Sequence, residues 1–143
     1  MVLEDLVRFY QELTLERVAL FSKFYSEDAY FKDPFNEVHG LASIQRIFTH
    51  MFHQVDEPAF KIHERLQDGK HVMLVWELHY RSGRSGARPK QVIRGASHLK
   101  LNAEGKVFFH RDYWDAAEEL YLKLPLLGWL MRALRKKLAA IAS

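Results

Sequence analysis

The sequence predicts a single α+β domain in which helices cover one face of a curved antiparallel sheet. Apolar residues recur with helical spacing through most of the first 55 residues, and with the alternating period of strands from Pro58 to about residue 114. The 143 residues are enough for one domain, and no linker or internal repeat interrupts them. A run of helices followed by a run of strands is typical of this class, and a curved sheet over helices leaves room for a ligand between the layers.

Three helices and one short strand are predicted in the first part of the chain. Residues 3–13 carry apolar side chains at helical spacing, and a second helix is expected to follow as far as about residue 25. Residues 28–33 are expected to form a strand that Asp33 and Pro34 end with turn chemistry. Gly40 precedes the clearest amphipathic helix, whose apolar positions are Ile44, Ile47, Phe48, Met51 and Val55.

Four further strands are predicted as an antiparallel meander. They cover residues 60–66, 71–80, about 91–101 and 107–114, and Asn102–Gly105 has the composition of a hairpin turn between the last two. One face of the first strand is expected to carry Phe60, Ile62, Glu64 and Leu66, which alternate with basic residues.

The charge distribution separates the last residues from the rest of the chain. The net charge is +3, yet no acidic residue follows Glu119, whereas five basic residues do: Lys123, Arg132, Arg135, Lys136 and Lys137. Because this segment supplies +5, the residues before it carry −2, and binding to nucleic acid is not predicted. No apolar run reaches the roughly 18–20 residues of a membrane span. The acidic N-terminus, without a signal peptide, and the lack of cysteine lead us to expect a cytoplasmic protein.

Residues 121–143 are predicted to form a basic amphipathic helix that follows a domain of residues 1–120. Six apolar residues recur there at helical spacing, with arginine and lysine opposite them: Leu127, Leu130, Met131, Leu134, Leu138 and Ile141. We expect this helix to pack on its own domain or on a dimer mate. Contact with an anionic membrane surface is the alternative interpretation.

The run FYSEDAYFKDPFNEVHGLASIQRIF (24–48) resembles the signature segment of the NTF2-like superfamily, in its SnoaL-like and ketosteroid-isomerase-like branch. The matching positions are Tyr25, Asp28, Ala29, Asp33, Pro34, Gly40 and Ile44, and the closing GKVFFHRDYWD (105–115) is similar to the last strand of this branch. The resemblance implies a cone-shaped fold, a curved sheet around an apolar pocket for a small apolar molecule, and assembly as a homodimer.

The same resemblance implies candidate catalytic positions. The steroid isomerase of the superfamily uses an aspartate base, with a tyrosine and a neutral aspartic acid as the oxyanion hole. The base falls on Asp33 and the tyrosine on Tyr10. The neutral acid is replaced by Ser97, which donates only a weaker hydroxyl, so the sequence departs from the steroid-isomerase pattern there.

Asp33 has two interpretations. An aspartate before proline is typical of a turn that ends a strand and needs only local hydrogen bonds. In the functional interpretation the carboxylate lies at the mouth of a pocket, near Phe31, Phe35 and Trp76.

The last predicted strand carries a second candidate pair. Alternation places His110, Asp112 and Trp114 on one face, which the resemblance turns toward the cavity. A histidine and an aspartate at i and i+2 can share a hydrogen bond that orients the imidazole. The polyketide-cyclase branch uses such an aspartate with a nearby histidine for aldol-type proton abstraction. The limonene-epoxide-hydrolase branch instead uses an Asp-Arg-Asp set, for which Arg111 or Arg94 would be required, and a buried structural network is the third interpretation.

We therefore expect general acid/base chemistry on an apolar carbonyl-type substrate, by an isomerase, a cyclase or a hydrolase. The expected catalytic residues are Asp33, Asp112, His110 and Tyr10, and the expected substrate-binding residues are Trp76, Leu74, Ser97, Trp114, Phe35 and Phe48. No cofactor is expected. No metal is expected either, because His50 and His53 lack further ligands at zinc-like spacing. The alternative is a non-catalytic ligand-binding or dimeric interaction domain, since one fold hosts many functions.

Overall fold

A computed structural model describes residues 3–82, 89–119 and 125–142. Six strands form one sheet in the order β2-β1-β6-β5-β4-β3, in which β1 and β6 run parallel and the other neighbours antiparallel. The elements are α1 (Leu3–Gln11), the 3₁₀ helix η1 (Glu16–Leu20), α2 (Phe21–Phe24), β1 (Tyr25–Lys32), β2 (Glu37–His39), α3 (Leu41–Gln54), β3 (Asp56–Asp68), β4 (His71–Arg81), β5 (Lys90–Leu101), β6 (Val107–Tyr113), α4 (Ala116–Glu119) and α5 (Pro125–Ala142).

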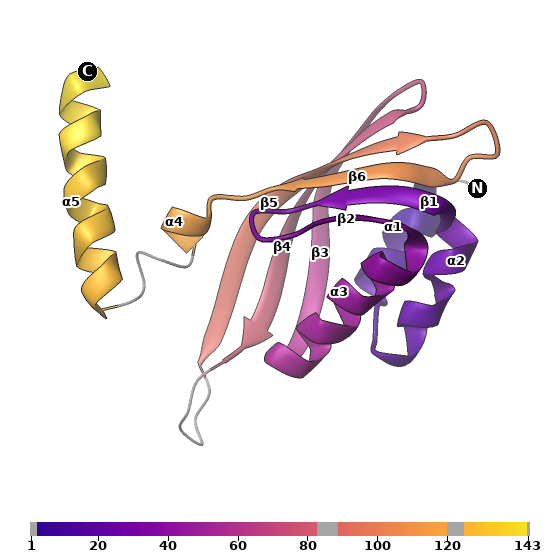
Figure 1. The fold of residues 1–143 in the computed structure, drawn as a ribbon, viewed down its shortest axis with the longest axis horizontal. Coiled ribbons are helices and arrows are strands. Elements are labelled where there is room, and N and C mark those ends of the chain that lie inside the picture. Colours follow the sequence, from indigo (N-terminus) through magenta and orange to yellow (C-terminus); the bar gives the residue numbers. More distant parts are fainter. Residues whose placement is uncertain (1–2, 83–88, 120–124, 143) are drawn as a thin grey trace.

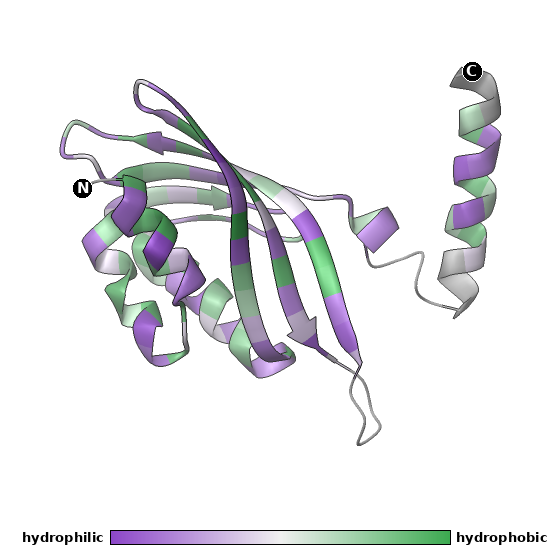
Figure 2. Ribbon diagram, turned by 180° about the vertical axis from the view of Figure 1, so that it is seen from behind, coloured by the Kyte–Doolittle hydropathy of each residue, from purple (hydrophilic) through white to green (hydrophobic). Residues whose placement is uncertain are grey.

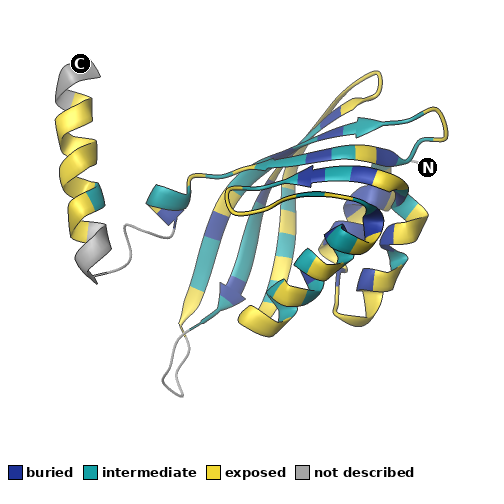
Figure 3. Ribbon diagram, viewed as in Figure 1, coloured by how far each residue is buried: buried dark blue, intermediate teal, exposed yellow. Residues whose placement is uncertain are grey.

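The three N-terminal α-helices pack on one face of a strongly curved sheet (Figure 1). Buried residues concentrate where these helices meet the sheet (Figure 3). Aromatic rings fill much of this core, and several of them meet edge to face or stacked: Phe9, Phe21, Phe24, Tyr25, Phe31 and Phe48. The α+β class and the antiparallel meander of β3 to β6 are confirmed.

The first part of the chain differs from the prediction at Tyr25. The predicted second helix is split into η1 and the four-residue α2, and β1 begins at Tyr25 instead of residue 28. The aromatic side chain of Tyr25 suits a helix face and a strand face equally, so periodicity placed it in the wrong element. The short strand β2, which pairs with β1, was not predicted.

A bulge in β3 overturns the predicted face of that strand. The pairing with β4 shifts between Ile62 and Glu64, so the residues beyond the shift change sides. Phe60 and Ile62 pack toward the core as expected, but Leu66 lies on the other face with 65% of its surface exposed. Arg65 takes the inward direction instead and pairs with Glu4 of α1 at 3.1 Å.

A second irregularity fixes the direction of the side chains of β6. Leu101 pairs with Val107 but Lys100 pairs with Phe109, so Phe108 is an extra residue in the strand. After this bulge His110 is buried under the helices, as the alternation from His110 to Trp114 predicted.

Gly40 sets the start of α3. Its φ of +103° lies in a region that L side chains rarely adopt, and its N–H donates to the carbonyl of Ala29 in β1 at 2.8 Å. This bond anchors the start of α3 to the strand, and the helix then runs along the open side of the sheet (Figure 1).

Helix α5 stands apart from the sheet, beyond α4 (Figure 1). Apolar and polar residues alternate around it (Figure 2), and its exposed side chains include Trp129, Leu130, Leu134 and Leu138. Its packing on the domain or on a mate in a homodimer stays a prediction. Among the residues described here, no helix is both long and apolar enough to cross a membrane.

The pairing of Trp76 in β4 with Gly95 in β5 is a close contact that requires glycine. A Cβ atom on Gly95 would lie 2.6 Å and 2.7 Å from two indole carbons of Trp76 and 3.0 Å from the carbonyl oxygen of Tyr113. The glycine thus leaves the space in which the indole lies against the inner face of the sheet.

We expect Gly95→Ala to lower the free energy of unfolding by about 1–3 kcal/mol, because the indole or the β6 backbone must move. Urea unfolding followed by circular dichroism measures this loss. In a Trp76→Phe background the same substitution should cost less, since a phenyl ring does not fill the same space. An equal cost in both backgrounds would show that the indole contact is not responsible.

Candidate functional site

A cavity of about 690 Å³ lies between α3 and the inner face of the sheet. Its walls are mainly apolar and aromatic, and its polar lining includes Asp33, Asp112, Arg46 and His50. An inner hollow of about 20 Å³ shares four lining residues with it: Phe48, Phe60, Trp76 and Asp112. The volume of the main cavity is within the range of small-molecule sites.

Asp112 lies where the cavity and the inner hollow meet. It is opposite Ser97 in the β5–β6 pairing, and one carboxylate oxygen, Oδ1, accepts the Ser97 hydroxyl at 2.5 Å. The same oxygen lies 2.6 Å from Nε2 of His110, two residues earlier on the strand. Ser97 in turn accepts the indole N–H of Trp76 at 2.8 Å. The Asp112 side chain is only 14% exposed, so these bonds offset much of the cost of burying a charge.

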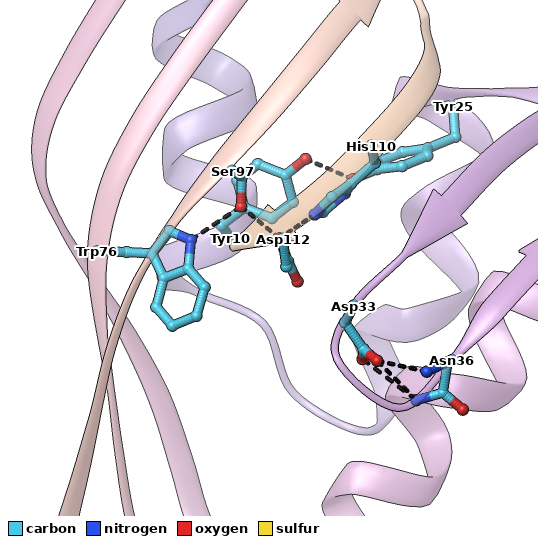
Figure 4. Close-up of polar contacts among 8 residues, drawn as sticks. All are labelled: Tyr10, Tyr25, Asp33, Asn36, Trp76, Ser97, His110 and Asp112. Carbon is cyan, nitrogen blue, oxygen red and sulfur yellow. Dashed lines mark hydrogen bonds and ion pairs between the residues drawn. The ribbon is translucent and has the colours of Figure 1, made fainter. Parts of the chain in front are cut away.

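His110 connects Asp112 to two buried tyrosines. Its Nδ1 is 2.5 Å from the hydroxyl of Tyr25, which is 2.5 Å from the hydroxyl of Tyr10 (Figure 4). Burial is the main reason that the pKa of the Tyr10 hydroxyl is raised above its usual range, and the charge of Asp112 adds to the effect. Burial likewise raises the pKa of Tyr25. Both phenols therefore keep their protons at neutral pH.

The structure brings the predicted site residues together around these two spaces. The inner hollow is lined by Tyr10, Leu74, Ser97 and His110, the main cavity by Asp33, Phe35 and Trp114, and both by Phe48, Trp76 and Asp112. The predicted contact between His110 and Asp112 is present. Tyr25 was not predicted as a site residue, although a buried tyrosine usually needs a partner for its hydroxyl.

Asp33 lines the main cavity but uses its carboxylate in a turn. Its Oδ1 accepts the backbone N–H groups of Phe35 at 2.8 Å and Asn36 at 2.7 Å, and both oxygens accept the amide of Asn36 at 3.1 Å and 3.2 Å. The Asp33 N–H donates back to the carbonyl of Asn36 at 2.9 Å. This is the geometry expected from the turn interpretation, and it occupies much of the accepting capacity of the side chain.

Neither candidate arginine pairs with Asp112. The guanidinium of Arg111 lies over the ring of Tyr113, 4.7 Å from its centre, while Arg94 pairs with Glu119 at 3.4 Å. An Asp-Arg-Asp set like that of the epoxide-hydrolase branch is therefore not assembled in this arrangement. Within the described part of the chain, no three histidine, aspartate or glutamate side chains are grouped so that they could hold a metal ion.

The SnoaL-like domain family matches residues 6–110 of the chain. No curated protein matches the sequence.

Solved structures with the same fold are numerous but distant in sequence. A proposed SnoaL-like polyketide cyclase from Shewanella denitrificans OS-217 is 22% identical, with a TM-score of 0.66 over 84% of this chain and 98% of that one. An NTF2-like protein of unknown function from Burkholderia pseudomallei K96243 is 11% identical, with a TM-score of 0.69 over 81% and 92%. A proposed isomerase of the SnoaL-like family from Agrobacterium tumefaciens C58 is 18% identical, with a TM-score of 0.62 over 78% and 92%. These similarities show the fold.

The turn at Asp33 can be tested by two substitutions. We expect Asp33→Ala to lower the free energy of unfolding by about 1 kcal/mol, because two backbone N–H groups lose their acceptor. Asp33→Asn should cost less, since its amide oxygen can still accept both bonds. Urea unfolding of the two variants measures the difference, and equal losses would contradict the hydrogen-bonding role of this side chain.

Proposed function

The chain belongs to the SnoaL-like family, and from this membership and the cavity geometry we propose an enzyme that removes a proton next to a carbonyl group. The substrate is a small, mainly apolar molecule, and the reaction is an aldol-type cyclisation or an isomerisation. One observation carries the proposal: the carboxylate of Asp112, whose side chain is 14% exposed, lies where the apolar cavity meets the inner hollow, with only one of its oxygens hydrogen bonded. Solved neighbours described as proposed cyclases and a proposed isomerase support the same class.

Asp112 has the arrangement of a general base. Ser97 and His110 hold Oδ1, which fixes the orientation of the carboxylate. Oδ2 has no hydrogen bond to any described residue and points into the space between Trp76 and the turn of Asp33 (Figure 4). An oriented carboxylate with one oxygen open to the substrate can accept a proton without first breaking a hydrogen bond.

The proposed step conserves protons and electrons. The C–H bond next to the carbonyl breaks, its proton goes to Oδ2 of Asp112, and its electron pair moves onto the carbonyl oxygen as an enolate. In a cyclisation the enolate carbon then forms a bond to a second carbonyl carbon of the same molecule, whose C=O π pair moves onto its oxygen, and this oxygen takes the proton back from Asp112. In an isomerisation Asp112 returns the proton to a different carbon. Phe48 and Trp76 supply aromatic wall on both sides of the junction where Asp112 lies.

The environments of the two cavity carboxylates favour Asp112 over Asp33 as the base. Asp33 accepts four hydrogen bonds and both of its oxygens are engaged. Asp112 accepts two, both on the same oxygen. We assign Asp33 to the turn and to the wall of the cavity.

A non-catalytic ligand-binding domain is the second candidate, and one observation favours it. Two donors of the inner hollow that could stabilise an enolate oxygen already have partners: the Tyr10 hydroxyl is hydrogen bonded to Tyr25, and the Trp76 N–H donates to Ser97. A binding domain would keep the cavity and need no oxyanion donor.

Exchange of carbon-bound hydrogen for deuterium separates the two candidates without knowledge of the natural substrate. We expect the protein to catalyse this exchange in D₂O for at least one of a panel of small apolar ketones and 1,3-diketones, measured by mass spectrometry. Asp112→Asn should slow it by roughly 10²–10⁴-fold, the usual contribution of a general base.

Asp33→Asn is the matched control, because it lies in the same cavity, and should change the rate only a few-fold. If Asp33→Asn loses the exchange while Asp112→Asn retains it, the general base is Asp33 and not Asp112. Ligand binding without exchange in the unmodified protein would favour the binding domain.

A further inference from the structure

A chain of three hydrogen bonds leads from Asp112 into the core of the protein. It runs from Oδ1 of Asp112 to Nε2 of His110, from Nδ1 of His110 to the Tyr25 hydroxyl, and on to the Tyr10 hydroxyl, with lengths of 2.6, 2.5 and 2.5 Å. Its members come from β6, β1 and α1, and His110 and both tyrosines are buried (Figure 4). His110, Tyr25 and Tyr10 make no other side-chain hydrogen bond to a described residue.

Counting donors fixes the direction of each bond. An ionised carboxylate only accepts, so Nε2 of His110 carries a hydrogen, and Nδ1 of the neutral ring is then an acceptor. The Tyr25 hydroxyl must therefore donate to Nδ1. Its oxygen can only accept from Tyr10, so the single hydrogen of Tyr10 is used within the chain. In this state Tyr10 has no hydrogen to offer to a ligand.

One added proton on His110 reverses the donor-to-acceptor direction of these hydrogen bonds. With Nδ1 also protonated, His110 donates to Tyr25, Tyr25 turns to donate to Tyr10, and the Tyr10 hydroxyl is released toward the inner hollow that it lines. No bond to carbon forms or breaks. The proton comes from solvent, and the charge of the imidazolium is balanced by Asp112 at 2.6 Å.

We propose that His110, Tyr25 and Tyr10 form a one-proton switch that makes Tyr10 a hydrogen-bond donor to a ligand oxygen only when His110 is doubly protonated. A ligand with an anionic oxygen, such as an enolate or a phenolate, then binds together with one proton. This inference uses the cavity of the proposed function as the ligand site, and it identifies the donor that the resting hydrogen bonds lack. Tyr25, which touches no ligand, is a positioning residue.

The charged surroundings of the imidazole are limited. The titratable groups that face it are Tyr10 from α1, Tyr25 from β1 and Asp112 on its own strand. The other neighbours around it are Phe31 of β1, Ser97 and Leu99 of β5, and Phe48 of α3. The further ionisable groups of the cavity, Asp33, Arg46, His50 and Tyr80, line the main cavity and not the inner hollow.

The ligand-free protein supplies the first test, by ¹⁵N NMR of its histidines. When the ring is neutral, we expect His110 to carry its hydrogen on Nε2 and none on Nδ1, because Nε2 faces the carboxylate and Nδ1 faces the Tyr25 hydroxyl. A neutral ring that carries its hydrogen on Nδ1 would overturn the proposal, because Tyr25 could not then donate to it.

The second test uses pentafluorophenol, a small apolar ring that is ionised at neutral pH and above. Calorimetry in buffers of different ionisation enthalpy should show uptake of about one proton on binding, and the affinity should fall about tenfold for each unit rise in pH where His110 is neutral. The ¹⁵N signal of Nδ1 should change to the protonated form in the complex. Binding without proton uptake, or no binding while His110 is protonated, would overturn the proposal.

Variants locate the switch. Tyr25→Phe should abolish proton uptake, because it breaks the connection between His110 and Tyr10. Tyr10→Phe should abolish the uptake too, and should weaken binding most at low pH, where the unmodified protein offers the Tyr10 hydrogen to the ligand. Tyr30→Phe, which removes a hydroxyl bonded to Glu37 instead, should behave as the unmodified protein. Proton uptake retained in Tyr25→Phe would contradict the mechanism. These outcomes are independent of turnover: a binding domain can show the switch, and an enzyme with Asp112 as its base can lack it.

Discussion

The hydrogen-bonded pair of the partly buried Asp112 and the buried His110 is the constraint on which the rest of the site depends. A carboxylate that is 14% exposed and an imidazole that is 4% exposed must find hydrogen-bond partners, since an unsatisfied buried group costs about 1–3 kcal/mol or more if charged. Their partners are Tyr25 of β1 and Ser97 of β5, which are hydrogen bonded in turn to Tyr10 of α1 and Trp76 of β4. The same bonds therefore connect α1 to the first residue of β1 and orient the indole in the cavity wall.

Much of this arrangement could be predicted, because two of its parts are local. Alternation along a strand places His110 and Asp112 on one face, and turn chemistry identifies Asp33 and Pro34, from a few residues each. The remainder depends on contacts between distant segments. Tyr25 meets His110 across 85 positions of sequence, and nothing near Tyr25 indicates whether it ends a helix or begins a strand. The bulges at Phe108 and after Ile62 appear in the pairing with the neighbouring strand and not in the alternation within one strand. The alternation within β3 therefore predicted, wrongly, that Leu66 points inward.

Asp33 and Asp112 show how position within one cavity gives two carboxylates different roles. The backbone of the turn folds around Asp33 and supplies two of its donors, so the group that stabilises the turn cannot also remain open to a ligand. Asp112 is in a regular strand, whose backbone bonds are taken by the sheet, and its donors are side chains that reach only one of its oxygens. An aspartate before a proline is easy to recognise in the sequence because it is typical of a turn, and this pattern does not indicate a catalytic group. The residue with the freer oxygen is the one whose local sequence is less distinctive.

The supply of hydrogen-bond donors then limits what the inner hollow can recognise. The Trp76 N–H donates to Ser97, and the Ser97 hydroxyl donates to Asp112. The Tyr10 hydroxyl donates to Tyr25, and the Tyr25 hydroxyl donates to His110. With each of these hydrogens in use, contact with the aromatic walls supplies the affinity for an apolar ligand, and a ligand oxygen has to displace an existing bond. Displacement at Trp76 or Ser97 leaves a buried group unsatisfied, whereas reversal of the tyrosine chain leaves every member satisfied. The least costly way to bind an oxygen here is therefore to add one proton, which ties the choice between hydrocarbon and oxygenated ligands to the protonation of a single histidine.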